Sequence, residues 1–72
     1  MKINKAIDEA NLILKQNLIK SAELDSEILM SEAIQKDRKY VILNLEENLK
    51  PEAVTVQILF VLSMLFQRLN RV

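Results

Sequence analysis

The chain has 72 residues, half of them apolar, and its ten acidic and ten basic side chains balance to a formal net charge of zero. That balance excludes the strongly basic surface with which nucleic-acid-binding domains attract phosphates, so we predict no DNA or RNA partner. Cys, His, Gly and Trp are all missing, which excludes Cys/His zinc sites and glycine-rich phosphate-binding loops.

The same missing residue types argue against catalysis. Without His and Cys, the chain lacks the commonest general base and the thiol nucleophile. The adjacent Glu46 and Glu47 diverge on any regular element, so we interpret them as part of a solvated loop and not as a catalytic pair or a metal site. We therefore predict no catalytic, cofactor-binding or metal-binding residue, and no enzymatic activity.

Length and the N-terminal residues bear on organisation and location. A chain this short folds as a single domain, here residues 1–72, and buries only about 60% of the surface of its unfolded chain. The first residues lead into Asp8 and Glu9 without the apolar segment and cleavage site of a secretion signal. We expect a cytoplasmic protein.

The first predicted helix begins near residue 3 and runs for about 14 residues, because its apolar residues recur at i, i+3, i+4 and i+7. These positions are Ile3, Ala6, Ile7, Ala10, Ile13 and Leu14. Asn4 is the candidate N-cap, and Asn17 is the residue expected to take a left-handed C-cap conformation in the absence of glycine.

Two short helices are predicted next. Ser21 is the expected N-cap of the first, whose apolar face comprises Leu24, Ile28, Leu29 and Ala33, widened by Met30 and Ile34. Asp37 is the expected N-cap of the second, which carries Tyr40, Val41, Leu43 and Leu45. The β-branched and aromatic residues leave a strand open there, but we favour a helix because an isolated strand has no partner to pair with.

The fourth predicted helix spans about residues 51–70 and begins at Pro51, since proline suits the first helical position. Eleven of the fourteen residues from Ala53 to Phe66 are apolar and cover the whole circumference, which predicts burial on all sides. A run of 14 residues reaches only about 21 Å, whereas a transmembrane helix needs about 20 apolar residues. We expect a central bundle helix or one shared between two chains, with Val54, Phe60, Val61 and Met64 as self-association candidates.

These elements predict an all-α fold, a small bundle of four helices, or five if the polar break at 44–50 forms a turn of helix. The predicted core consists of Ile7, Ala10, Leu14, Leu24, Ile28, Leu29, Val41, Ile58, Leu62 and Leu65.

One stretch is similar to a known family. The pattern Leu24-Asp25-x-Glu27-Ile28-Leu29, followed by a polar junction and Asp37-Arg38-x-Tyr40, resembles the N-terminal helical domain of HemK-type release-factor glutamine methyltransferases over about residues 5–52. The resemblance implies a domain that presents a class I release factor to a separate catalytic domain. The chain contains neither the Asn-Pro-Pro-Tyr loop nor the glycine-rich S-adenosylmethionine loop of that catalytic domain.

Two departures from the family pattern are evident. Gln35 stands where relatives often have a glycine that ends the second helix, so another residue or a tight continuation must close that turn. The fourth helix is apolar where that of relatives is usually polar and basic.

Arg38 and Tyr40 are the candidate partner-binding residues. For Arg38 the sequence favours a structural role, in which it binds the last carbonyls of the second helix. For Tyr40 it favours a position at the edge of the core, with the hydroxyl in water.

Three hypotheses for function follow. The first is a non-catalytic protein-binding domain whose partner is a class I release factor or a separately encoded methyltransferase domain. The second is a structural module that forms a homodimer through the apolar fourth helix. The third, attachment of residues 53–72 to a membrane surface with Arg68 and Arg71 at the headgroups, is disfavoured because interfacial helices need a polar face.

Overall fold

The computed structural model describes residues 1–69 of the chain, without the side chain of Leu69, and in this range it contains four helices and no strand. They are α1 (Ile3–Gln16), α2 (Ala22–Ile34), α3 (Arg38–Leu43) and α4 (Pro51–Leu69). This confirms the predicted all-α fold. The break at 44–50 contains a turn closed by Glu47 N and Asn44 O at 2.9 Å, but no fifth helix.

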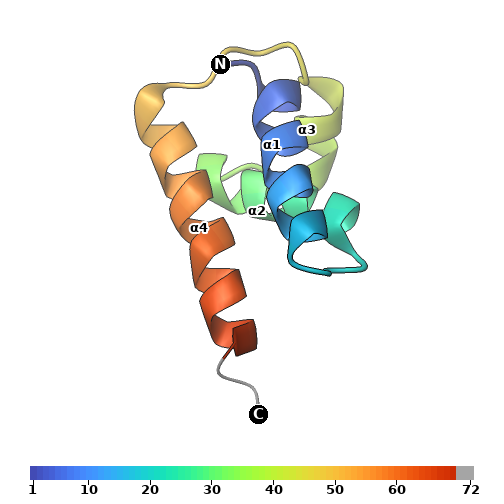
Figure 1. The fold of residues 1–72 in the computed structure, drawn as a ribbon. Helices are drawn as coiled ribbons and strands as arrows, with labels where there is room; N and C mark the ends of the chain where they lie inside the picture. Colours follow the sequence, from blue (N-terminus) through green and yellow to red (C-terminus); the bar gives the residue numbers. More distant parts are fainter. Residues whose placement is uncertain (70–72) are drawn as a thin grey trace.

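Helix α2 lies at the centre of the molecule and packs against the three other helices, while α4 packs mainly against α2 and α1 (Figure 1). The prediction that the fourth helix is buried on all sides is therefore wrong. Because α4 is apolar around its circumference, a one-sided contact leaves part of its apolar surface in solvent.

No side chain caps the N-terminus of α1. Backbone carbonyls of the 44–50 segment cap it instead. The backbone N–H groups of Ile3 and Asn4 donate to the carbonyls of Glu47 and Leu45, at 3.0 and 2.9 Å. The Asn4 side chain instead donates to Glu46 Oε1 at 3.2 Å, so its predicted capping role is wrong. The 44–50 segment thereby satisfies donors that a helix start leaves without partners.

Helix α1 ends in a Schellman motif, in which Ile19 N donates to Leu14 O and Leu18 N donates to Lys15 O, both at 3.0 Å. The left-handed residue is Leu18, with φ of 63°, and not Asn17, whose φ is −102°. The prediction for Asn17 is wrong by one position. Ile19 and Leu14 are both buried, which is the apolar contact that accompanies this motif.

The ends of α2 differ from expectation in two details. Ser21 occupies the N-cap position, but its hydroxyl donates to Asp25 Oδ2 at 2.6 Å and caps no backbone group. At the other end Gln35 itself adopts the left-handed conformation, with φ of 58°, and closes the turn without a glycine. The expected cap of α3 is confirmed, because Asp37 Oδ1 accepts from Tyr40 N at 2.8 Å.

The core consists of two clusters. The first core cluster contains Ile3, Ala6, Ile7, Met30 and Val41, with Ile34 and Leu49 packed against it. The second core cluster contains Ala10, Leu14, Ile19, Ala22 and Val61, with Ile13, Leu29, Met64 and Leu65 packed against it. Helices α1 and α2 both contribute to the two clusters and join them.

Among the predicted core residues, Ile7, Ala10, Leu14 and Val41 are buried, and Leu29 and Leu65 are half-buried. The prediction is wrong for Leu24, Ile28, Ile58 and Leu62, which are exposed. In α2 the buried stripe is formed by Ala22, Ser26 and Met30. The small side chains of Ala22 and Ser26 let neighbouring helices approach α2 closely. Because this side of α2 faces the core, Leu24 and Ile28, which lie on other sides of the helix, are exposed.

Candidate functional site

The corner between α2 and α3 holds Arg38, the first residue of α3. Its Nε and Nη2 atoms lie 2.9 and 2.7 Å from Glu27 Oε1. Arg38 therefore binds a side chain of α2, and the prediction that it binds the last carbonyls of that helix is wrong. The Arg38 side chain is half exposed and Glu27 is largely covered. The ion pair holds α3 on α2 and leaves the remaining guanidinium donors toward solvent.

An open hollow lies beside this ion pair. It is lined by Lys20, Ser21, Glu23, Leu24, Glu27 and Arg38. Residues of both charges surround one exposed leucine here, which suits a polar protein surface better than a small-molecule site, because small-molecule sites are enclosed and mostly apolar.

Tyr40 lies half-buried on α3, and its hydroxyl donates to Glu47 Oε1 at 2.6 Å in an exposed hydrogen bond, a partner that the sequence did not indicate. The hydrogen bond raises the pKa of Tyr40, and partial desolvation and the negative charge of Glu47 act in the same direction. The Lys36 ammonium lies 5.3 Å from the centre of the ring, within the range of a cation–π contact. Tyr40 thus ties α3 to the 44–50 segment.

Glu46 and Glu47 diverge as predicted, but each has a protein partner. Glu46 Oε2 lies 2.8 Å from Lys2 Nζ, and this hydrogen bond and ion pair raise the pKa of Lys2. Glu47 accepts from Tyr40. The two carboxylates fix the 44–50 segment to the start of α1 and to α3. The sequence did not reveal this role, because Lys2 is 44 residues from Glu46 and the contact of Tyr40 with Glu47 depends on how the chain turns after α3.

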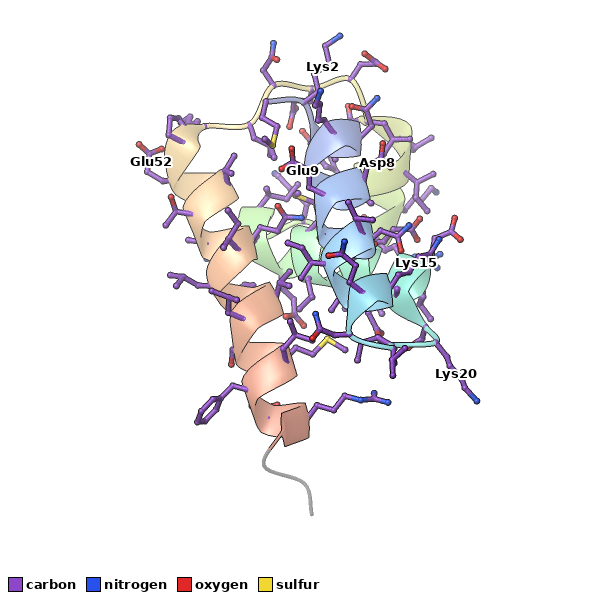
Figure 2. All side chains as sticks on the ribbon, in the orientation of Figure 1. Lys2, Asp8, Glu9, Lys15, Lys20 and Glu52 are labelled. Carbon is purple, nitrogen blue, oxygen red and sulfur yellow. The ribbon has the colours of Figure 1, made fainter. Side chains whose placement is uncertain are left out.

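The exposed face of α4 carries several large apolar side chains. Its exposed residues, here called the α4 stripe, are Ile58, Leu59, Leu62 and Phe66, with 46%, 57%, 54% and 65% of their surface exposed. Figure 2 shows Glu52, at the start of this helix, pointing away from α1. Ile58 also lines the groove between α4 and α1, and Leu59, Leu62 and Phe66 border an open hollow that Asn17, at the end of α1, lines as well.

The self-association candidates lie elsewhere on α4. Val61 is 2% exposed in the second core cluster, and Met64 packs against the same cluster. Val54 lines the narrow groove between α4 and α1, and Phe60 is half-buried. The structure therefore removes Val61 from the candidates and assigns the exposed apolar surface of α4 to the stripe.

The remaining chemistry of the described residues is limited. Within residues 1–69, no three or more acidic side chains gather in a way that could hold a metal ion. In the same part of the chain, every helix is too short or too polar to cross a bilayer.

Comparison with known proteins identifies the family. The family model described as the PrmC N-terminal domain matches residues 5–71 and so includes α4, beyond the region 5–52 in which the sequence pattern suggested a relationship. No curated protein and no solved structure matches the chain significantly. The match covers nearly the whole chain and agrees with the resemblance carried by residues 24–40. The chain therefore belongs to the family of N-terminal domains of PrmC/HemK methyltransferases.

Proposed function

We propose that this chain is a non-catalytic protein-binding domain that recognises a class I release factor or a separately encoded methyltransferase domain. The observation that supports this proposal is the family match over residues 5–71, which corresponds to the helical domain that precedes the catalytic domain. The four helices supply surfaces and no evident reaction centre, which suits recognition.

The corner between α2 and α3 is the proposed contact surface for this partner. Arg38 uses Nε and Nη2 on Glu27 and retains further N–H donors on a half-exposed side chain. The hollow beside it adds Lys20 and Glu23, so charges of both signs are available to a polar partner surface. Rigid placement by the ion pair lowers the entropy lost when such a side chain binds.

The binding test uses the immobilised chain and a purified bacterial class I release factor, with the methyltransferase domain as a second analyte. We expect retention at micromolar concentration, and at least a several-fold loss of affinity for Arg38→Ala. Lys39→Ala is the matched control, since Lys39 is the next residue, carries the same charge and is exposed. Failure of both analytes to bind would contradict the proposal, and equal losses for the two variants would contradict the assignment of Arg38.

A second candidate function is structural self-association through α4. The specific observation in its favour is the α4 stripe, because a contiguous exposed apolar patch on the order of a few hundred Å² often marks an interaction site. Light scattering tests it, since a homodimer has twice the 8.3 kDa mass of one chain. A monomer at every concentration from micromolar to millimolar would contradict self-association but would not affect the proposal that the chain binds a release factor or a methyltransferase domain.

A further inference from the structure

We propose that the α4 stripe packs against the α4 stripe of a second copy of this chain, with the two helices antiparallel and related by a twofold axis near Phe60 and Val61. This inference rests on the self-association proposed above and specifies its geometry.

The spacing of the outward residues carries the argument. Three of the four stripe residues, Leu59, Leu62 and Phe66, follow Thr55 at intervals of four, three and four residues, and Ile58 lies to one side of this row, toward α1. With about 100° between successive residues, the residues of this row fall within about 60° of one another on one side of the helix. Intervals of four and three are those of a helix-packing seam.

The order four, three, four reads the same in both directions along the chain, so an antiparallel copy brings each residue opposite another member of the set. Leu59 then meets Leu62 of the second copy, and Leu62 meets its Leu59, at the centre of the contact. Thr55 meets Phe66 of the second copy at both ends. A self-complementary arrangement of this kind is what a twofold interface requires.

Side-chain size also favours the antiparallel arrangement. It places the largest side chain of the set, Phe66, over Thr55, the smallest. The Thr55 hydroxyl already donates to Pro51 O at 3.1 Å, so covering it leaves no donor without a partner. A parallel pair would instead place Phe66 against Phe66 and leave space between the two threonines.

The charged residues of α4 also favour the antiparallel arrangement. Residues 53–67 carry no charged side chain, so the contact itself buries no ion. Glu52 lies on the outward side of α4, three residues before Thr55 (Figure 2). A parallel pair would bring the two Glu52 carboxylates together, whereas an antiparallel pair holds them at opposite ends, where they do not repel one another.

The available area is sufficient for a weak homodimer. Large apolar side chains present on the order of 150–250 Å² each, so the four half-exposed residues of the stripe offer roughly 400 Å² per copy. Two copies bury about 800 Å² in this way, and Thr55 adds to it, so the total stays below about 1,200 Å², where standard specific interfaces begin, and lies in the range of weak complexes. Association is therefore expected to depend on concentration in the micromolar range.

The first part of the test measures mass by sedimentation equilibrium. We expect the wild-type chain to change from monomer to dimer as its concentration rises, and Leu62→Lys to stay monomeric with an unchanged helical circular dichroism signal. Leu43→Lys is the matched control, because Leu43 is an exposed leucine of α3, with 71% of its surface in solvent. A wild-type monomer at all concentrations, or equal loss of dimer in both variants, would overturn the inference.

The second part measures orientation with spin labels on Ser63→Cys and Gln67→Cys, two polar exposed positions in a chain without native cysteine. In the antiparallel pair the two labels are offset along the helix axis by about 20 Å at position 67 and about 7.5 Å at position 63, from the 1.5 Å rise per residue. In a parallel pair the two positions give equal distances. A dimer with equal distances would overturn the antiparallel geometry but leave self-association intact, whereas absence of a dimer would remove both.

Discussion

Two residues without the freedom of glycine adopt left-handed backbone conformations. Leu18 and Gln35 have φ values of 63° and 58° and close the C-termini of α1 and α2. For an L-residue this conformation costs roughly 1–2 kcal/mol, and glycine is the usual occupant. Since the chain contains no glycine, this strain is retained at both helix ends.

Replacing Leu18 with glycine is therefore expected to stabilise the fold. Leu18 is 83% exposed, so its side chain contributes little packing. After the greater entropy of glycine in the unfolded chain is subtracted, Leu18→Gly should raise the free energy of unfolding by about 0.5–1 kcal/mol. Urea titration measures it. Asn17→Gly is the control, because Asn17 has a negative φ, and this variant should be less stable than the wild type. If Asn17→Gly were stabilising and Leu18→Gly destabilising, Leu18 would not be strained.

The Tyr40 hydroxyl titrates under the influence of one neighbour. Its hydrogen bond to Glu47 raises the folded-state pKa above the ordinary value of 10.0. A raised pKa in the folded state means that the bond contributes stability below pH 10, and that this contribution is lost as the pH rises through the folded-state pKa. Tyr40 is the only tyrosine in the chain, so its tyrosinate absorbance reports on this site alone.

Glu47→Ala is expected to lower the pKa of Tyr40 toward 10.0, as measured by ultraviolet absorbance against pH. Glu46→Ala serves as the control because it removes the same charge from the adjacent residue, whose partner is Lys2. The control should leave the Tyr40 titration close to that of the wild type. An unchanged midpoint in Glu47→Ala would show that the hydrogen bond does not exist in solution.

At the scale of elements, the positions of the helices were predictable and the side that one of them buries was not. Caps and breaks mark the ends, as Asp37 and Pro51 illustrate, and the apolar period of α1 identifies its buried face. Helix α4 offers no such signal, because apolar residues surround it. The side of α4 that is buried depends on the shape of the surface formed by α1 and α2. The sequence of α4 alone does not contain this information.

In the candidate site, likewise, the residues were predictable from the sequence and their contacts were not. Arg38 and Tyr40 were identifiable from the family-like stretch, but their partners Glu27 and Glu47 were not. These partners come from another helix and from a loop, so each pair depends on a chain turn whose direction is fixed by tertiary packing. The role of Gln57 was also missed, since the apolar run around it gave no sign of a polar contact between α4 and α1.

Gln57 in fact joins α4 to α1. It is 2% exposed, and its Nε2 donates to Ala6 O at 3.1 Å. Gln57→Ala removes this bond and leaves space between the helices, so the free energy of unfolding should fall by about 1–3 kcal/mol. Gln67→Ala, an exposed glutamine of the same helix, should change it by less than about 0.5 kcal/mol. Thermal denaturation compares them, and equal effects would place Gln57 in solvent.

The whole molecule depends on α1 and α2 together to unite two cores that are each small. The first core cluster joins α1 to α2 and α3, and the second joins α1 to α2 and α4. A cluster of about five buried side chains is too small to hold its helices alone, because ordering each residue costs about 1–2 kcal/mol of backbone entropy. The two clusters should therefore form and melt together.

Leu14→Ala tests this coupling, since Leu14 is fully buried in the second core cluster and lies far along α1 from the first. The loss of packing should cost about 2–5 kcal/mol. Two probes follow unfolding in urea: far-ultraviolet circular dichroism for all four helices, and fluorescence of Tyr40, next to Val41 in the first core cluster. If the clusters are coupled, both midpoints fall by the same amount, as two-state unfolding requires. A Tyr40 midpoint that stays at its wild-type value while the circular dichroism midpoint falls would show instead that α3 and the first core cluster fold independently of α4.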